Sequence, residues 1–160
     1  MSKFTTLAMV ALLSMGTVSA GFAADENNTA PGLTAAGAPL GLHGVDPVAF
    51  IDLGNRADGS AAYTGVHDGV AYYFASQANL DTFKKNAAAY VPQNGGFCTY
   101  GVSVGKKFDG DPEYAAVVDG ELFVFLNEDI FKLYQKDTAG TISKADDQWK
   151  KIQHTAAAKL

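Results

Sequence analysis

Cys98 offers the most reactive side chain in this sequence, and it is the only cysteine among the 160 residues. A lone thiol has no partner for a disulfide within its own chain. As a thiolate it is a soft ligand for copper(I) or zinc, and beside an imidazole it can act as a nucleophile. A free cysteine is also among the residue types most often buried in a core. The sequence alone leaves these three roles open for Cys98.

His43 is the histidine best suited to join this thiol as a second metal ligand. It lies next to Gly44, at the expected entry to the folded domain, although a partly exposed turn histidine is the simpler interpretation. His67 precedes a turn and His154 lies near a helix end, where a histidine interacts favourably with the helix dipole. The spacings Cys-x-x-Cys, His-x-x-x-His and His-Glu-x-x-His do not occur, which argues against a closed zinc site. Cys98 and His43 are therefore the candidate ligands of a low-coordinate metal site.

Three carboxylates alternate along one short stretch, at Asp109, Asp111 and Glu113. This spacing matches part of a calcium-binding loop, but the glycine is misplaced and no bidentate acid follows at the required distance. A solvated turn is the simpler interpretation.

Two Asp-Gly pairs, at 68–69 and 119–120, each separate two apolar runs. Asp-Gly accepts the positive φ angles of a two-residue hairpin loop, and the flanking residues are β-branched or aromatic. The pattern predicts hairpins over 63–74 and 115–126, and we expect a third strand over 97–104.

Helix signals follow these hairpins. Ser76 is a candidate N-cap for a helix from 77 to about 85, and Asn127 for a second helix with acidic residues in its first turn. A last helix is expected from about 143 to 154. Strands and helices do not alternate as βαβ units, so the predicted fold class is α+β: a small antiparallel sheet with hairpins, packed by several short helices.

The first twenty residues have the features of a secretory signal peptide. One lysine precedes a short apolar stretch, and small residues surround the expected cleavage site after Ala20. Residues 21–39 carry few large apolar groups and are predicted to be a flexible leader, with structure starting near Leu40. We expect a domain over 40–154, a tail over 155–160, and a periplasmic or secreted protein without a membrane anchor after cleavage.

Composition narrows the function classes. The chain has a formal net charge of −5 and 48% hydrophobic residues, which suits one globular domain. An acidic chain lacks the basic face that a nucleic-acid binder needs. Glycine-rich stretches are present, but without the spacing of a phosphate-binding fingerprint.

Several segments together resemble the YHS domain family, and most closely its exported, single-domain bacterial branch. The resemblance spans about residues 40–152 and is carried by GVDPVAF at 44–50, YFAS at 73–76, YVPQNGGFCTY at 90–100 and DGEL at 119–122. It implies an α+β fold. The shorter members of the family are regarded as heavy-metal-binding modules, often beside copper pumps.

The metal-binding cysteines of those shorter members are replaced in this chain. Ala49, Ala75 and Asn79 stand where they carry cysteines, while Cys98 matches the Gly-Gly-aromatic-Cys segment of the exported branch. His43 has no counterpart in the pattern.

These observations lead to a first hypothesis of a non-catalytic exported domain that binds copper(I) through Cys98 and His43, for metal handling or tolerance. The alternative is a metal-free module in which Cys98 is structural and the region of Gly95 and Gly96 shapes a pocket for a small ligand or a protein partner. Self-association through the apolar strands is a further form of that alternative. An enzyme using Cys98 as nucleophile ranks third.

Overall fold

The computed structural model of the protein describes residues 26–160. The expected signal peptide, residues 1–20, and the first five residues of the expected leader lie outside this range. Within residues 26–160, no helix is long and apolar enough to cross a membrane.

The structure confirms both predicted hairpins. Strand β1 (Ser60–His67) pairs with β2 (Val70–Phe74), and β3 (Asp111–Val118) pairs with β4 (Glu121–Phe125), in both cases antiparallel. Both aspartates of the turns have positive φ angles, 46° at Asp68 and 52° at Asp119, and each is followed by a glycine. The two hairpins form two separate two-stranded sheets, so the expected single sheet is divided in two.

Short helices pack around these sheets, and the predicted α+β class is confirmed. The helices are α1 (Pro47–Leu53), α2 (Gln77–Lys85), α3 (Thr99–Ser103), α4 (Glu128–Lys136) and α5 (Thr138–Ile152). Ser76 and Asn127 cap α2 and α4 as expected, each accepting a hydrogen bond from a backbone N–H three residues ahead. Helix α5 begins about five residues earlier than expected, because Asp137 caps it by accepting from the N–H of Gly140. Residues 26–160 also contain four 3-10 turns: η1 (Leu42–Gly44), η2 (Ala87–Ala89), η3 (Gln93–Gly96) and η4 (Ala157–Lys159).

The strand predicted over 97–104 is wrong. Asn94, Gly95 and Gly96 all have positive φ angles, which turn the chain immediately before Cys98. The Cys98 sulfur then accepts a hydrogen bond from the N–H of Gly101 and caps α3. A backbone that turns in this way cannot continue as an extended strand, so the segment forms a helix that packs against α5.

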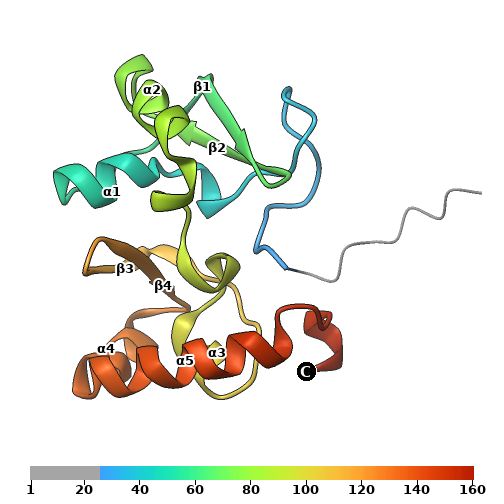
Figure 1. Ribbon diagram of the computed structural model, residues 1–160, viewed down its shortest axis with the longest axis vertical. Coiled ribbons are helices and arrows are strands. Elements are labelled where there is room, and N and C mark those ends of the chain that lie inside the picture. Colours follow the sequence, from blue (N-terminus) through green and yellow to red (C-terminus); the bar gives the residue numbers. More distant parts are fainter. Residues whose placement is uncertain (1–25) are drawn as a thin grey trace, which may run out of the picture.

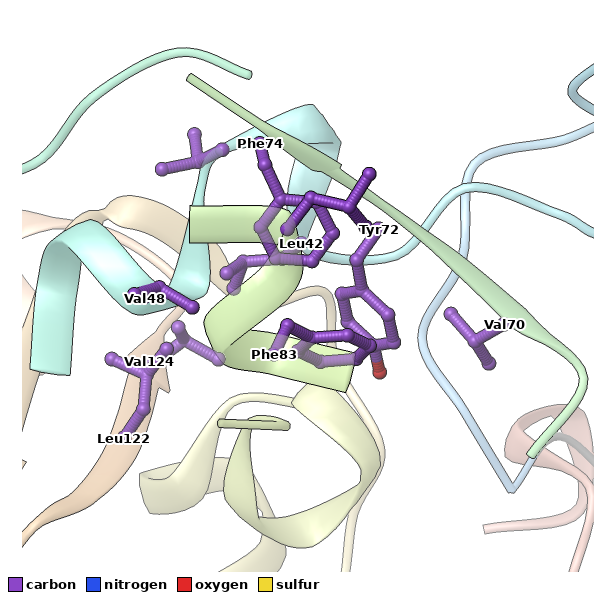
Figure 2. Packing of buried hydrophobic residues seen from close by; sticks show 10 residues of the cluster. Leu42, Val48, Val70, Tyr72, Phe74, Phe83, Leu122 and Val124 are labelled. Atoms are coloured by element: carbon purple, nitrogen blue, oxygen red, sulfur yellow. The ribbon is translucent and has the colours of Figure 1, made fainter. Parts of the chain in front are cut away.

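A hydrophobic core joins the two hairpins. In Figure 1 the hairpin β1–β2 lies with α1 and α2, and the hairpin β3–β4 lies with α3, α4 and α5. Figure 2 shows the rings of Tyr72, Phe74 and Phe83 packed together, with Leu122 and Val124 of β4 beside Val48. Phe83 lies 4.8 Å from Phe74 and 5.5 Å from Tyr72 between ring centroids. Because residues of both hairpins share this core, neither hairpin buries its apolar face alone.

Contacts with the domain begin before Leu40, where the sequence suggested that structure would start. The N–H of Asn28 donates to the carbonyl of Gly95 at 2.8 Å, and the N–H of Ala30 donates to that of Leu40 at 2.8 Å. The expected tail also has structure, because it contains η4 and Leu160 packs against a small core cluster.

Candidate functional site

Cys98 lies in the interior of the structure. It is 1% exposed and packs in a cluster with Phe123, Phe125 and Tyr134. Burial raises the pKa of its thiol, and the charge of Asp109 raises it further, against the lowering effect of nearby backbone hydrogen bonds. A thiol kept protonated in aromatic surroundings is a poor nucleophile and a poor metal ligand. These surroundings favour a packing role for Cys98.

His43 pairs with a carboxylate. Its Nε2 lies 3.0 Å from Oδ1 of Asp109, and its side chain is 40% exposed. Asn28 donates from Nδ2 to the same carboxylate oxygen at 2.6 Å and to the carbonyl of Gly96 at 3.0 Å. Burial by itself would raise the pKa of Asp109, but the hydrogen bonds from Asn28 and His43 and the charge of His43 lower it overall. The three side chains line a small hollow of about 420 Å³ and hold the segment around Asn28 against the domain.

Residues 26–160 do not form a conventional metal-binding site. No group of three or more histidine, cysteine, aspartate or glutamate side chains within residues 26–160 is arranged to hold a metal ion. Cys98 already accepts a hydrogen bond from Gly101, and His43 is paired with Asp109. A copper(I) site at Cys98 and His43 stays a prediction, and the contacts of the two residues do not favour it.

A cleft lies beside the glycine-containing turn that precedes Cys98. It measures about 550 Å³, within the size range of small-molecule sites. Four parts of the chain line it: residues 26–27, the end of the β1–β2 hairpin with Tyr72, residues 88–95, and Trp149 and Gln153 of α5. Cys98 and His43 do not line this cleft.

Asn94 is the most unusual residue of the cleft wall. It is 5% exposed and has a φ angle of 53°, in the left-handed region that asparagine tolerates better than most residues. Its side-chain oxygen is buried and accepts no hydrogen bond from any residue between 26 and 160. Leaving such a group unpaired costs about 1–3 kcal/mol.

Tyr72 presents a second polar group at the same cleft. The residue is 4% exposed, and its ring packs on Phe83 in the core. In Figure 2 its hydroxyl points away from Phe74, at the edge of the core cluster. Burial raises the pKa of this hydroxyl, and the charge of Asp68 raises it further. The hydroxyl therefore stays protonated at ordinary pH and is available as a hydrogen-bond donor.

Trp149 contributes an aromatic ring to the lining of the cleft, and two other side chains contact this ring. The ring centroid lies 6.2 Å from that of Phe97, and Nζ of Lys107 lies 5.2 Å from both centroids. Lys107 also donates to the carbonyls of Gln153 and Thr155 at 2.9 Å, beyond the end of α5. These contacts fix the indole against the cleft.

Gly95 is required where the cleft meets the N-terminal segment. Its φ angle is 63°, and a Cβ there would collide with the carbonyl oxygen of Glu26 and press on the ring of Trp149. Only glycine permits this close approach together with a left-handed backbone.

The charged side chains of the cleft are acidic. Glu26 and Asp68 line it, with His154 at 2.7 Å from Glu26 and His67 at 3.4 Å from Asp68. Among the described residues, no lysine or arginine lines the cleft.

Sequence reasoning pointed to the glycines before Cys98 as a pocket region, but it did not single out Asn94, Tyr72 or Trp149. The Asn-Gly pair at 94–95 was a usable signal, because it indicates positive φ angles. Nothing in the sequence showed that Tyr72 and Trp149 would meet there.

Comparison of the chain with models of protein families, with curated proteins and with solved structures gave no match. The resemblance to YHS domains stays a prediction.

Proposed function

We propose that this protein is a binding module for a small polar ligand, held in the cleft between the β1–β2 hairpin, residues 88–95 and α5. The observation that carries the proposal is the side chain of Asn94. It lines the cleft, is almost fully buried, and has an oxygen without a partner among the described residues. A ligand that donates to this oxygen would remove the cost of its burial, and because the atom is not solvent-exposed, neighbouring side chains must shift for the ligand to reach it.

The smaller hollow beside His43 is less suited to binding a polar ligand than the larger cleft. There the polar side chains of Asn28, His43 and Asp109 already bond to one another. In the larger cleft, the side-chain oxygen of Asn94 is buried and accepts no hydrogen bond from any other described residue. A site with buried, unpaired polar groups has more to gain from a ligand.

Binding without thiol chemistry is the form of activity that we propose. Cys98 does not line the cleft and is 1% exposed, so its sulfur is not available to a ligand bound beside Asn94.

Trp149 provides the test, since it is the only tryptophan in the chain and lines the cleft. We would titrate the protein with acetamide, glycinamide, glycerol and N-acetylglycine. Tryptophan emission and the backbone amide signals in a ¹H–¹⁵N correlation spectrum would report binding. We expect at least one probe to bind with millimolar affinity, shifting the signals of residues 91–95 and Trp149.

The matched variant is Asn94→Gly, which removes the carboxamide and keeps the left-handed backbone without strain. The control is Asn55→Gly, an exposed asparagine outside the cleft. Binding lost in folded Asn94→Gly and kept in Asn55→Gly would support the proposal. Saturating probes that move no signal from the cleft would refute it.

A further inference from the structure

We infer that the cleft binds the free amino terminus of a peptide, recognising its first amide group through Asn94 and Tyr72 and its ammonium group through Glu26 and Asp68. This inference rests on the proposed function and names the chemical class of the ligand.

The amide part of the inference comes from the hydrogen-bonding capacity of Asn94. The carboxamide of Asn94 offers an acceptor oxygen and a donor NH₂, and a peptide group offers one N–H donor and one carbonyl acceptor. The Asn94 oxygen is buried and unpaired within the described chain. Tyr72 adds a hydroxyl that stays protonated because burial raises its pKa. A trans peptide group that donates its N–H to the Asn94 oxygen has a carbonyl on its opposite side, which can accept from a different donor such as the Tyr72 hydroxyl.

The charge part comes from the acidic side chains of the same cleft. Glu26 and Asp68 line it from two different segments, and no lysine or arginine of residues 26–160 does so. An anion entering the cleft would meet only carboxylates and the two histidines beside them. A cation would be attracted. The side chain of Asp68 is 85% exposed, so solvent screens the attraction and charge selectivity should be modest.

The two features belong together in one kind of molecule. In the amino terminus of a peptide, an ammonium group lies two bonds from the first amide carbonyl carbon. A volume of about 550 Å³ accommodates such a group together with a side chain against Trp149. The indole would contribute an apolar surface for that side chain.

Three matched probes separate the two parts of the inference. Glycylglycinamide has the ammonium and two amides, N-acetylglycylglycinamide replaces the ammonium with a third, uncharged amide, and N-succinylglycinamide carries an anion beside two amides. Ethylammonium adds a cation without an amide. We expect glycylglycinamide to bind about two- to fivefold more tightly than its acetylated form, as an exposed charge pair allows, and the other two to bind more weakly than both.

The hairpin turns supply a matched pair of variants. Asp68→Asn removes the charge at the cleft, and asparagine suits the left-handed turn position at least as well. Asp119→Asn makes the same change at the equivalent position of the other hairpin, outside the cleft. We expect the preference for glycylglycinamide over its acetylated form to fall toward one in Asp68→Asn and in Glu26→Gln, and to persist in Asp119→Asn.

Several results would overturn the inference while the proposed function stands. These are equal or tighter binding of N-succinylglycinamide, binding of glycerol with no binding of either amide peptide, or a charge preference unchanged by Asp68→Asn and Glu26→Gln together. If no probe of either panel binds, the proposed function itself fails. The two failures are therefore distinguishable.

Discussion

Asp46 is completely buried, and its carboxylate joins three elements of the fold. Oδ1 accepts from the backbone N–H groups of Val48 at 2.8 Å and Ala49 at 3.1 Å, which caps α1. Oδ2 accepts from the N–H of Ala75 at 2.8 Å, just after β2, and from Nδ2 of Asn79 in α2 at 2.6 Å. Replacing Asp46 with alanine removes all four acceptor contacts at once.

The expected loss of unfolding free energy in Asp46→Ala follows from how deeply the four donors are buried. Loss of an N-cap costs about 1 kcal/mol. Each buried donor left unpaired costs about 1–3 kcal/mol, and less where water can reach it. The N–H groups of Val48 and Ala49 are buried, whereas those of Ala75 and Asn79 are only partly buried. We therefore expect Asp46→Ala to lower the free energy of unfolding by about 2–4 kcal/mol.

Asp46→Asn is a finer test of the same arrangement. It keeps one oxygen for the cap of α1, but its NH₂ group then faces donors at Ala75 and Asn79. Because Asn79 can rotate its amide to present an oxygen, we expect a smaller loss of about 1–2 kcal/mol.

Urea unfolding monitored by Trp149 fluorescence measures these losses. Ser76→Ala is the matched control, since Ser76 caps α2 with one hydrogen bond to the N–H of Asn79 at 3.1 Å, and it should cost about 1 kcal/mol. If Asp46→Ala costs no more than Ser76→Ala, the carboxylate does not hold the three elements together and the reasoning is wrong.

Three further predictions concern other buried or paired groups. Burial raises the pKa of the Cys98 thiol, so Cys98 should resist iodoacetamide in the native protein with or without copper(I) and react once the protein unfolds. Mass spectrometry measures this alkylation. A native thiol that reacts, and that copper(I) protects, would instead support the metal site. The pKa of Asp109 in the folded protein lies below its ordinary value of 3.8. The stability that Asp109 adds through Asn28 and His43 is therefore fully present above pH 3.8, and it is lost as the pH falls through the folded-state pKa. The difference in unfolding free energy between wild type and Asp109→Asn should therefore shrink in acid, and a pH-independent difference would contradict this. Thr99 is fully buried with a hydroxyl that has no partner among the described residues, so Thr99→Val should raise the unfolding free energy by about 1 kcal/mol; a clear loss in urea unfolding would show that the hydroxyl is satisfied.

Local signals in the sequence were sufficient to predict the two hairpins and the first residues of two helices. Asp-Gly at 68–69 and 119–120 predicts turns because the required φ angles depend on those two residues alone. Ser76 and Asn127 each cap a helix through a hydrogen bond to a backbone N–H three residues ahead. Interactions of such short range do not depend on where the rest of the chain lies, so composition and spacing reveal them.

The segment around Cys98 shows where local pattern was insufficient. Residues 97–104 have the apolar and β-branched character of a strand, yet they form α3. Their conformation depends on the turn at Asn94–Gly96, on the bond from the N–H of Cys98 to the carbonyl of Phe108, and on packing against α5. Tertiary contacts of this kind override intrinsic strand preference.

The candidate site was decided by tertiary structure. Asn28 meets Gly96 across 68 positions of sequence, and His154 meets Glu26 across 128. The cleft exists because the N-terminal segment, the first hairpin, the turn at Gly95 and α5 converge around Asn94. The sequence by itself determined the two hairpin turns, the caps of α2 and α4 and the α+β class, since the turns and caps follow from neighbouring residues. Which polar groups were buried without a partner depended on the packing of distant segments, and only the folded structure could show that.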